Sequence, residues 1–247
     1  MSHEPGTVAA RGRAPVEVRP SRDGGDAAWR ALHRAACAPY RRVGRFAWHF
    51  ARGKLRWDPV FRALLERGAL PAHARVLDIG CGQGLLASLL AAIDAAHVGG
   101  HWPATWPTAP TGARYTGVEL MPRDIARGRA ALAAWPGGAE MVCADMRAAL
   151  LPPSDVVVIL DVLHYIDHTA QEALLLRVRD ALRLRGRLLL RVGDAADRRG
   201  YLASQWVDRI VTRVRGHCVA PTYGRTAADW TALLERLGFS VACVPMS

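Results

Sequence analysis

The feature that most constrains this chain is a glycine-rich turn between a short apolar run and a helix-forming run. The run Arg75–Ile79 is suited to a buried parallel strand, and glycines follow at positions 80, 82 and 84. Residues 85–92, mostly leucine and alanine, predict a helix. Because glycine has no Cβ, a ligand can approach this turn closely, and the helix that starts there offers free N–H groups. With Asp78 aimed at the same turn, the stretch predicts a site for a nucleotide-like ligand with a polar, partly anionic tail.

The spacing of the glycines narrows the kind of nucleotide. A dinucleotide motif places its third glycine where this chain has Leu85, and no Gly-Lys-Ser/Thr follows as in a P-loop. The sequence from Val76 to Gly84, Val-Leu-Asp-Ile-Gly-Cys-Gly-Gln-Gly, resembles motif I of the class I S-adenosylmethionine-dependent methyltransferases. On this stretch alone, a glycine turn in another α/β fold is the alternative.

Two acidic residues further along agree with the resemblance. Arg114–Leu120 predicts a second strand with Glu119 at its carboxyl end, where a carboxylate can accept both hydroxyls of a ribose. Asp145 follows a third predicted strand, Ala139–Cys143, and the resemblance implies that it binds the adenine amino group. A dehydrogenase would explain the glycines and Glu119 but has no need of Asp145. The resemblance implies that S-adenosyl-L-methionine is the cofactor and that its contacts are Asp78, Gly80, Cys81, Gly82, Gly84, Glu119, Leu120, Asp145, Met146 and Asp161.

The segment after the fourth predicted strand, Ser154–Leu160, carries the candidate catalytic group. Residues 161–166 resemble motif IV of the bacterial small-molecule branch, and the Asn-Pro-Pro-Tyr sequence of enzymes that methylate exocyclic nitrogens is absent. His164 is the candidate general base because histidine titrates near neutral pH; a histidine that caps the next helix is the alternative. Tyr165 is expected to contact cofactor or substrate, and no metal is expected.

Three helices are predicted before the glycine turn: Ala27–Ala38, Tyr40–Gly53 and Asp58–Leu70. The resemblance implies that such helices cover the cofactor and shape the substrate pocket. We therefore expect Tyr40 and His49, together with Tyr165, to contact the substrate, with ordinary packing on the core as the alternative.

The pattern of elements predicts one α/β domain with a doubly wound, mostly parallel sheet. Residues 1–25 are predicted to be a disordered tail, and residues 26–247 a single domain. Within this domain we expect a helical cap (26–72), a loop insert (95–113) and a lid (195–225). A helix is expected over 169–184, a fifth strand over 187–192, a helix over 226–237 and a sixth strand over 239–244. The final antiparallel strand of the family is expected to be missing.

The charge of the chain is uneven, and it bears on partners and compartment. The net charge is +11, and no acidic residue lies between Asp26 and Asp58. This indicates either a solvated surface or an anionic partner: a phosphopantetheine-carrying protein, a coenzyme A thioester, an acidic membrane face or, less favoured, nucleic acid. The five cysteines are scattered, the start does not resemble a signal peptide, and no apolar stretch reaches the roughly 20 residues of a membrane span. A reducing cytoplasm fits these features.

Together these features predict methyl transfer from S-adenosylmethionine to a small-molecule acceptor, of an aromatic or an acyl-carrier or lipid-pathway kind. RNA methylation is one alternative. The other is a non-catalytic cofactor-binding protein that uses the tryptophan-containing insert as its contact surface.

Overall fold

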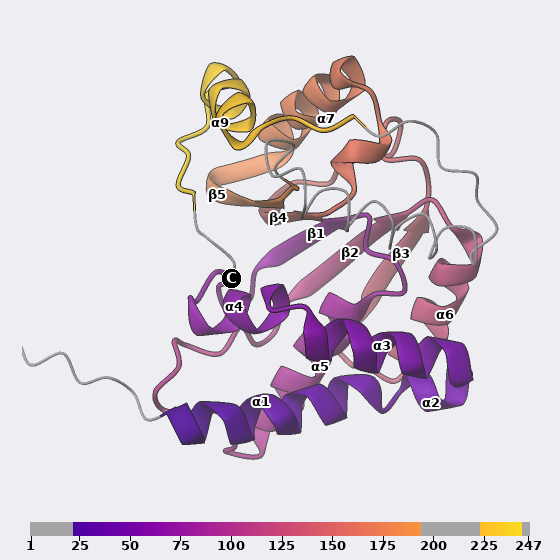
Figure 1. Ribbon diagram of the computed structural model, residues 1–247. Helices are drawn as coiled ribbons and strands as arrows, with labels where there is room; N and C mark the ends of the chain where they lie inside the picture. The colour runs from indigo at the N-terminus through magenta and orange to yellow at the C-terminus, as the bar shows by residue number, and fades with distance from the viewer. Residues whose placement is uncertain (1–21, 194–222, 244–247) are drawn as a thin grey trace, which may run out of the picture.

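The computed structural model describes residues 22–193 and 223–243, which form a parallel sheet covered by helices on both faces (Figure 1). The elements before the glycine turn are α1 Arg22–Cys37, α2 Tyr40–Val43, α3 Arg45–Trp57 and α4 Val60–Glu66. Those that follow are β1 Arg75–Ile79, α5 Leu85–Val98, β2 Arg114–Glu119, α6 Pro122–Leu132, β3 Ala139–Cys143, β4 Ser154–Leu160, the 3-10 turn η1 Leu163–Tyr165, α7 His168–Ala181, β5 Leu182–Arg191 and α9 Ala227–Arg236. The predicted doubly wound α/β fold is confirmed.

The order of the strands sets the place of a ligand. Within the described residues the sheet runs β3-β2-β1-β4-β5, and every neighbouring pair is parallel. The chain moves outward from β1 through β2 to β3 and then returns to the other side of β1 with β4. Open α/β sheets bind ligands at the carboxyl ends of the strands next to such a reversal. The ends of β1 and β4 are therefore the expected place of the site.

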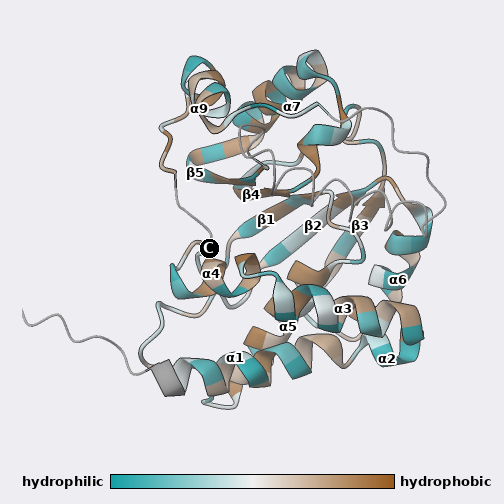
Figure 2. Cartoon of the chain, in the orientation of Figure 1, coloured by the Kyte–Doolittle hydropathy of each residue, from teal (hydrophilic) through white to brown (hydrophobic). Residues whose placement is uncertain are grey.

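The two faces of the sheet bury different side chains because neighbouring residues of a strand point to opposite sides. Val76 and Tyr115 face a core formed with α1 and α3–α6, whereas Leu77 and Ile79 face a second core formed with α7 and α9. Figure 2 shows the hydrophobic residues of β1 and β4 between these layers. The sheet is thus covered on both faces, as parallel sheets require.

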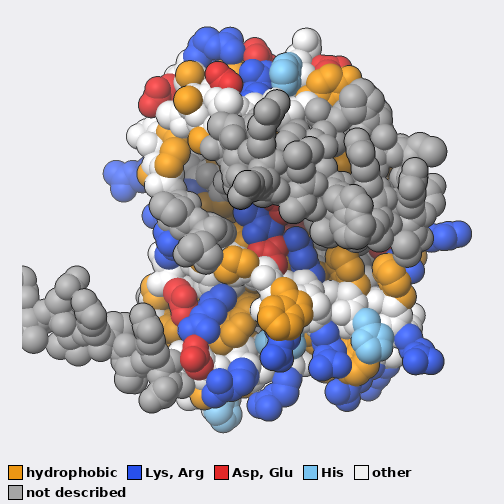
Figure 3. All heavy atoms as spheres, viewed as in Figure 1, with side chains coloured by type: hydrophobic (Ala, Val, Ile, Leu, Met, Phe, Trp, Pro, Cys, Tyr) orange, Lys and Arg blue, Asp and Glu red, His pale blue; other side chains and the backbone are white. Residues whose placement is uncertain are grey.

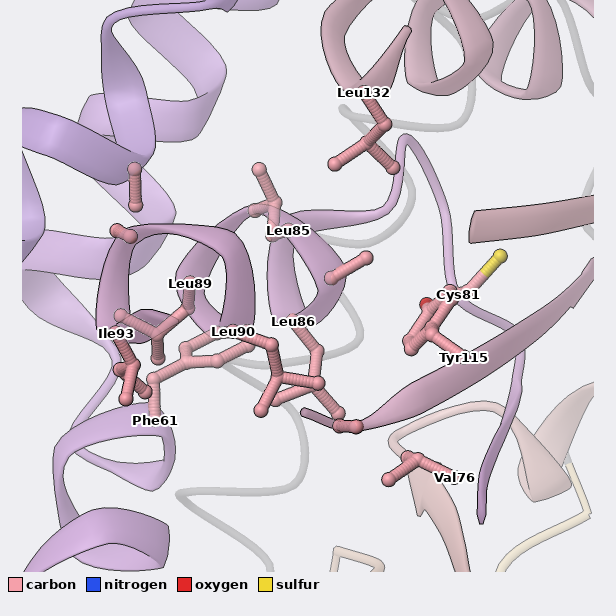
Figure 4. Close-up of a cluster of buried hydrophobic side chains, with 14 of the residues drawn as sticks. Phe61, Val76, Cys81, Leu85, Leu86, Leu89, Leu90, Ile93, Tyr115 and Leu132 are labelled. Atoms are coloured by element: carbon pink, nitrogen blue, oxygen red, sulfur yellow. The ribbon is translucent and has the colours of Figure 1, made fainter. Parts of the chain in front are cut away.

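Helix α5 is the centre of the first core. Its residues from Leu85 to Leu90, and Ile93, are all buried, so the helix is apolar on every side rather than on one stripe. Figure 4 shows its leucines between Phe61 of α4 and Tyr115 of β2. The leucine and alanine run that predicts a helix therefore also predicts a fully enclosed one.

Several predicted boundaries were wrong, each for a local reason. The predicted helix Tyr40–Gly53 is two helices, because Gly44 adopts a positive φ of 142°, far from the helical value, and breaks the run. Helix α1 begins at Arg22, five residues before the predicted start and inside the predicted tail; the rest of that tail lies outside the described residues. The predicted lid also lies outside them, apart from residues 223–225.

The last strands differ most from the prediction. Helix α7 ends at Ala181 and β5 begins at once, with residues 183–186 bulging opposite Asp155. Arg185 takes a left-handed backbone at φ 64°, so the break expected between the helix over 169–184 and the strand over 187–192 lies inside the strand. The sixth strand predicted over 239–244 was wrong for its described part, since 239–243 adopt no strand.

The insert packs on the domain instead of extending from it. Helix α5 continues to Val98, so the loop begins later than the predicted residue 95. Trp102 and Trp106 meet edge to face at 5.3 Å, and both pack against the first core. The Trp102 indole N–H donates to the Pro107 carbonyl at 2.9 Å. These contacts favour a stabilising role for the loop. Among the described residues, no helix has the length and apolarity needed to cross a membrane.

A cluster of charged side chains fastens the amino-terminal helices to the sheet. Asp58, between α3 and α4, pairs with Arg191 at the end of β5 and accepts from the Lys54 ammonium at 2.7 Å. Arg191 also pairs with Asp161, the residue that follows β4. The Asp58 carboxylate is almost fully buried. Burial alone would raise the pKa of Asp58, but the hydrogen bonds and charges of Arg191 and Lys54 outweigh it and lower the pKa to about 2.

We expect Asp58→Ala to lower the free energy of unfolding by about 2–3 kcal/mol, because it leaves Arg191 half paired in a mostly buried place. Asp180→Ala is the matched control: its pair with Arg179 is largely exposed, so its removal should cost about 0.5 kcal/mol or less. Urea denaturation at neutral pH measures both. Equal losses for the two variants would contradict a fastening role for Asp58.

The same pair carries a pH dependence with a defined sign. Since the folded pKa of Asp58 is below its unfolded value of about 4, the stabilisation is complete above pH ~4 and is lost as the pH falls towards about 2. The stability difference between the native chain and Asp58→Asn should therefore shrink over that interval. A constant difference in acid titrations of unfolding would show that folding does not lower the pKa of Asp58.

Candidate functional site

The glycine turn leaves β1 in a backbone conformation that side chains rarely allow. Gly80, Gly82 and Gly84 all have positive φ, at 79°, 56° and 75°. A Cβ at Gly80 would collide with Val162, which follows β4, so the turn packs directly on the neighbouring strand end. A Cβ at Gly82 would meet nothing within 4 Å. Gly82 therefore exposes backbone to open space, where a ligand can approach.

Glu119 lies beside this open backbone, as the sequence predicted for the end of β2. One carboxylate oxygen accepts from the Gly82 N–H at 2.9 Å, and the other accepts from the Met121 N–H at 2.9 Å. The side chain is half-buried, and each oxygen keeps a second lone pair for a hydroxyl donor. Leu120 next to it is 60% exposed and offers an apolar surface. The turn and the carboxylate thus form one continuous rim.

Tyr40 holds the turn from beneath. Its hydroxyl donates to the Gln83 carbonyl at 2.7 Å, and the side chain is completely buried. Gln83 in turn donates from its side-chain amide to the Ala47 carbonyl of α3 at 3.0 Å. The predicted substrate contact of Tyr40 does not fit this burial, because the hydroxyl is already used inside the protein. Cys81 is likewise buried, with its side chain in the first core.

Asp78 is a buried carboxylate directly under the turn. It is 5% exposed and accepts a hydrogen bond from the Tyr115 hydroxyl at 2.7 Å. Burial raises the pKa of Asp78 to about 7, opposed by the Tyr115 hydrogen bond and assisted by the nearby Glu119 charge. The buried carboxylate of Asp78 is bonded to Tyr115 within the core, so we expect it to affect the site through the position of the strand and the turn.

The segment after β3 brings Asp145 to the same edge of the sheet. Both oxygens of Asp145 accept from the Arg147 guanidinium, Oδ1 at 3.1 Å and Oδ2 at 2.9 and 2.5 Å, and Oδ1 also accepts from the Arg147 backbone N–H at 2.8 Å. Arg177 of α7 donates to the carbonyls of Met146, Arg147 and Ala149 and fixes this segment. The carboxylate of Asp145 is therefore held in place, and a ligand donor would share it with Arg147.

Asp161 and His164 follow β4. Asp161 has a left-handed backbone at φ 57°, its N–H donates to the Arg191 carbonyl at 3.0 Å, and its carboxylate pairs with the Arg191 guanidinium. His164 lies in η1, half-buried, with its ring 4.1 Å from that of Tyr165. The His164 carbonyl accepts from the Tyr223 N–H at 2.9 Å, which joins η1 to the segment before α9.

His49 is not brought to the site in the same way. It is exposed on α3, with its ring 4.7 Å from that of Trp48. By its spacing, His49 lies on the same side of α3 as Arg45 and Arg52. Lys54 projects from another side of the helix and pairs with Asp58 and Asp161. A substrate contact for His49 is therefore not favoured.

Sequence reasoning missed Lys54, Asp58, Arg191, Tyr115 and Gln83. The Asp58–Arg191 pair joins residues 133 positions apart, and no local pattern predicts such a pair. Tyr115 could have been found once the strands are paired, because Asp78 lies opposite Gly117 and Tyr115, two residues before Gly117, points to the same face of the sheet. The described residues contain no group of three or more His, Cys, Asp or Glu side chains placed to hold a metal ion.

Two surface clefts lie elsewhere, at the amino-terminal edge of the sheet. One is lined by Arg75, Arg114 and Ser154, among others, and the second by residues around His73 and Arg187. Neither touches the glycine turn or the residues after β4. Since parallel sheets bind ligands at their carboxyl edge, we place the site at the glycine turn.

Comparison with known proteins identifies the family of this chain. A family described as "Methyltransferase domain" matches residues 47–244. The chain belongs to this methyltransferase family. The match covers the glycine turn together with Glu119, Asp145 and Asp161, so the predicted family is confirmed.

Solved structures support the fold of this methyltransferase domain. Magnesium protoporphyrin IX methyltransferase from Synechocystis PCC 6803, solved with bound S-adenosylhomocysteine, is 19% identical, with 90% of this chain and 91% of that chain covered at a TM-score of 0.50. A Bacillus halodurans C-125 protein described as a methyltransferase is 18% identical, with 72% and 68% covered and the same TM-score.

A third comparison covers less of both molecules. The CcbJ methyltransferase from Streptomyces caelestis is 23% identical, with 53% of this chain and 47% of that chain covered at a TM-score of 0.40. The match thus spans about half the length of that protein. No curated protein matches the sequence.

The raised pKa of Asp78 predicts a stability that falls with pH. Between its unfolded value of about 4 and its folded value of about 7, the folded chain holds one more proton, so Asp78 lowers the unfolding free energy by about 1.4 kcal/mol per pH unit. Asp78→Asn keeps an oxygen for Tyr115 and removes this slope. Thermal unfolding of both chains between about pH 4.5 and about pH 8 should show the variant gaining stability relative to the native chain as the pH rises. Parallel curves would contradict a buried, titrating Asp78.

Proposed function

We propose that this methyltransferase domain transfers the methyl group of S-adenosyl-L-methionine to a small-molecule acceptor. The observation that carries the proposal is the rim formed by Gly82 and Glu119, with open space at Gly82 and the carboxylate 2.9 Å from its N–H. A structural neighbour of the same fold carries S-adenosylhomocysteine, which supports the choice of ligand. When bound, the cofactor supplies a methyl group that its sulfonium has already activated. The chain is left with the tasks of binding, orientation and proton transfer.

The residues of the rim suit a ligand of this shape. Glu119 would accept the ribose hydroxyls with the lone pairs that its two backbone hydrogen bonds leave available. Leu120 and Met146 would lie along the adenine, and Asp145 would accept from its amino group beside Arg147. Asp78, Gly80, Cys81 and Gly84 would shape the turn rather than contact the ligand through side chains. Asp161 would border the methyl group, held in place by Arg191.

The acceptor side of the proposal rests on the residues after β4. His164 would remove a proton from a weakly acidic acceptor, and Tyr165, which is partly exposed beside it, would contact the acceptor. An aromatic acceptor, or one linked to an acyl carrier or to lipid metabolism, is the class that we favour. The four described cysteines, Cys37, Cys81, Cys143 and Cys243, are all free, which supports a reducing cytoplasm as the compartment.

Cofactor binding can be tested with two matched glycine variants. Gly82→Ala and Gly138→Ala place a Cβ at φ 56° and 71°, and neither Cβ meets another atom within 4 Å. Both should cost about 1 kcal/mol of stability through backbone strain. Only Gly82 borders the proposed ligand, so only Gly82→Ala should weaken the binding of S-adenosylhomocysteine, by about tenfold or more, in isothermal calorimetry.

A nicotinamide dinucleotide serves as the competing ligand in the same experiment. Heat with the dinucleotide and none with S-adenosylhomocysteine would overturn the proposed function. Equal weakening of S-adenosylhomocysteine binding in the two glycine variants would instead show that strain, and not approach to Gly82, explains the loss.

The role of His164 can be separated from a structural one by kinetics. Removal of a general base costs about 10²–10⁴ in rate, so His164→Gln should lower kcat by that order while the affinity for S-adenosylhomocysteine stays unchanged. A base also requires that the acidic limb of the pH–rate profile disappears in the variant. Unchanged turnover with any accepted small molecule would rule His164 out, and methylation of RNA but of no small molecule would favour the alternative activity.

A further inference from the structure

Helix α3 carries two neighbouring stripes of side chains along its outer side, one basic and one aromatic. Arg45, His49, Arg52 and Arg56 are three or four positions apart, so they share one side of the helix, and all four are exposed. Phe46, Phe50 and Trp57 each lie one position after a member of this set and form an adjacent stripe, in which Gly53 occupies the position between Phe50 and Trp57. The opposite side carries Ala47, Ala51 and Leu55, which are buried in the first core. The basic stripe and the aromatic stripe are therefore the side of α3 that the protein itself does not cover fully.

The basic stripe lies in a wider positive surface. Neither its arginines nor Arg41 and Arg42 of α2 form an ion pair with a carboxylate in the part of the chain that the structure describes. The Trp48 ring is flanked by two guanidinium groups, of Arg41 at 5.3 Å and Arg52 at 4.7 Å, which joins α2 to the stripe. Figure 3 shows Lys and Arg side chains gathered over the part of the molecule formed by α1–α3.

The aromatic stripe is more exposed than a packed stripe would be. Trp57 is 77% exposed and Phe46 is 43% exposed, although both are large apolar side chains. Phe46 and Phe50 stack with ring centroids 6.2 Å apart, and the Arg127 guanidinium lies 4.6 Å over Phe46. The stripe thus combines apolar surface with cationic groups at its border.

We propose that α3 lies along the surface of an anionic lipid bilayer, with its arginines on the lipid phosphates and Trp57 and Phe46 at the level of the headgroups. A helix of 13 residues is about 20 Å long and presents both stripes in parallel to a flat surface. Arginines beside exposed tryptophan and phenylalanine are the composition of interfacial helices. An acidic protein would match the arginines, but it would not by itself explain an exposed aromatic stripe along the same helix.

This placement also orients the site. Lys54, on the side of α3 next to the aromatic stripe, pairs with Asp58 and lies 3.9 Å from Asp161, which follows β4. The aromatic stripe consequently lies between the bilayer-facing arginines and the residues proposed to border the methyl group. An amphipathic acceptor held in the bilayer would reach the site along this stripe. The docking goes beyond the proposed methyl transfer, because binding to lipid requires no turnover.

Sedimentation of the full chain with vesicles tests the proposal. We expect binding to vesicles of phosphatidylcholine with phosphatidylglycerol, weak binding to phosphatidylcholine alone, and loss at high salt. The triple variant Arg45→Gln, Arg52→Gln, Arg56→Gln should lower the partition coefficient about a hundredfold, at roughly 1 kcal/mol per arginine. Trp57→Ala should lower it several-fold even at moderate salt, because it removes apolar contact rather than charge.

A matched control carries the same loss of charge elsewhere. Arg75→Gln, Arg114→Gln, Arg185→Gln changes three exposed arginines at the amino-terminal edge of the sheet. Native-like binding of this control, with loss in the α3 variant, supports the proposal. Equal loss of binding in both variants would show attraction by net charge alone and would overturn the proposal. Absence of vesicle binding would also overturn it, whether or not the chain binds an acidic carrier protein or RNA. Calorimetry with S-adenosylhomocysteine on the α3 variant shows independently whether the cofactor site is intact.

Discussion

The left-handed backbone of the glycine turn is the constraint on which the site depends. The chain leaves the buried strand β1 and must become the buried helix α5 within the space between Val162 and α6. A Cβ at Gly80 would overlap Val162, and a Cβ at Gly84 would press on Leu132 at 3.0 Å. The Gly80 N–H donates to the Val118 carbonyl at 2.8 Å, so the turn is also tied to β2 just before Glu119. Backbone geometry, more than flexible side chains, therefore places the open edge of Gly82 against the carboxylate.

The amino-terminal helices belong to this arrangement although they precede it by many residues. The Tyr40 hydroxyl donates to the Gln83 carbonyl, and the Ala47 carbonyl accepts from the Gln83 side-chain amide. Loss of either buried hydrogen bond would leave a polar group unsatisfied, at a cost of about 1–3 kcal/mol. At the other end of α3, Asp58 fastens the helices to Arg191 and through it to Asp161. Helix α3 thus spans the carboxyl edge of the sheet from the turn to the ends of β4 and β5. A change in its position would move both halves of the site together.

The sequence was sufficient for the parts of the fold that follow from local pattern. An apolar run, three glycines and a leucine-rich helix predict a strand, a turn and a buried helix, and parallel strands bring Glu119, Asp145 and Asp161 to one edge. Whether a helical side chain lines a pocket or packs in the core was harder to predict. The position of Tyr40 in its helix is compatible with either place. The start of β5 was missed because residues 183–186 bulge within the strand, and the Asp58–Arg191 pair was missed because it is formed only by the folded chain.

Some residues of α3 are needed for folding, and others are not explained by it. The small buried residues Ala47 and Ala51 let the helix approach the core closely, and Lys54 completes an ion-pair cluster. The outer arginines have no such partner among the described residues, and like charges at helical spacing destabilise a helix by a few tenths of a kcal/mol per pair. Exposed Trp57 likewise gains little from the fold. Since packing does not account for these stripes, their arrangement is best explained by an anionic, partly apolar surface outside the protein.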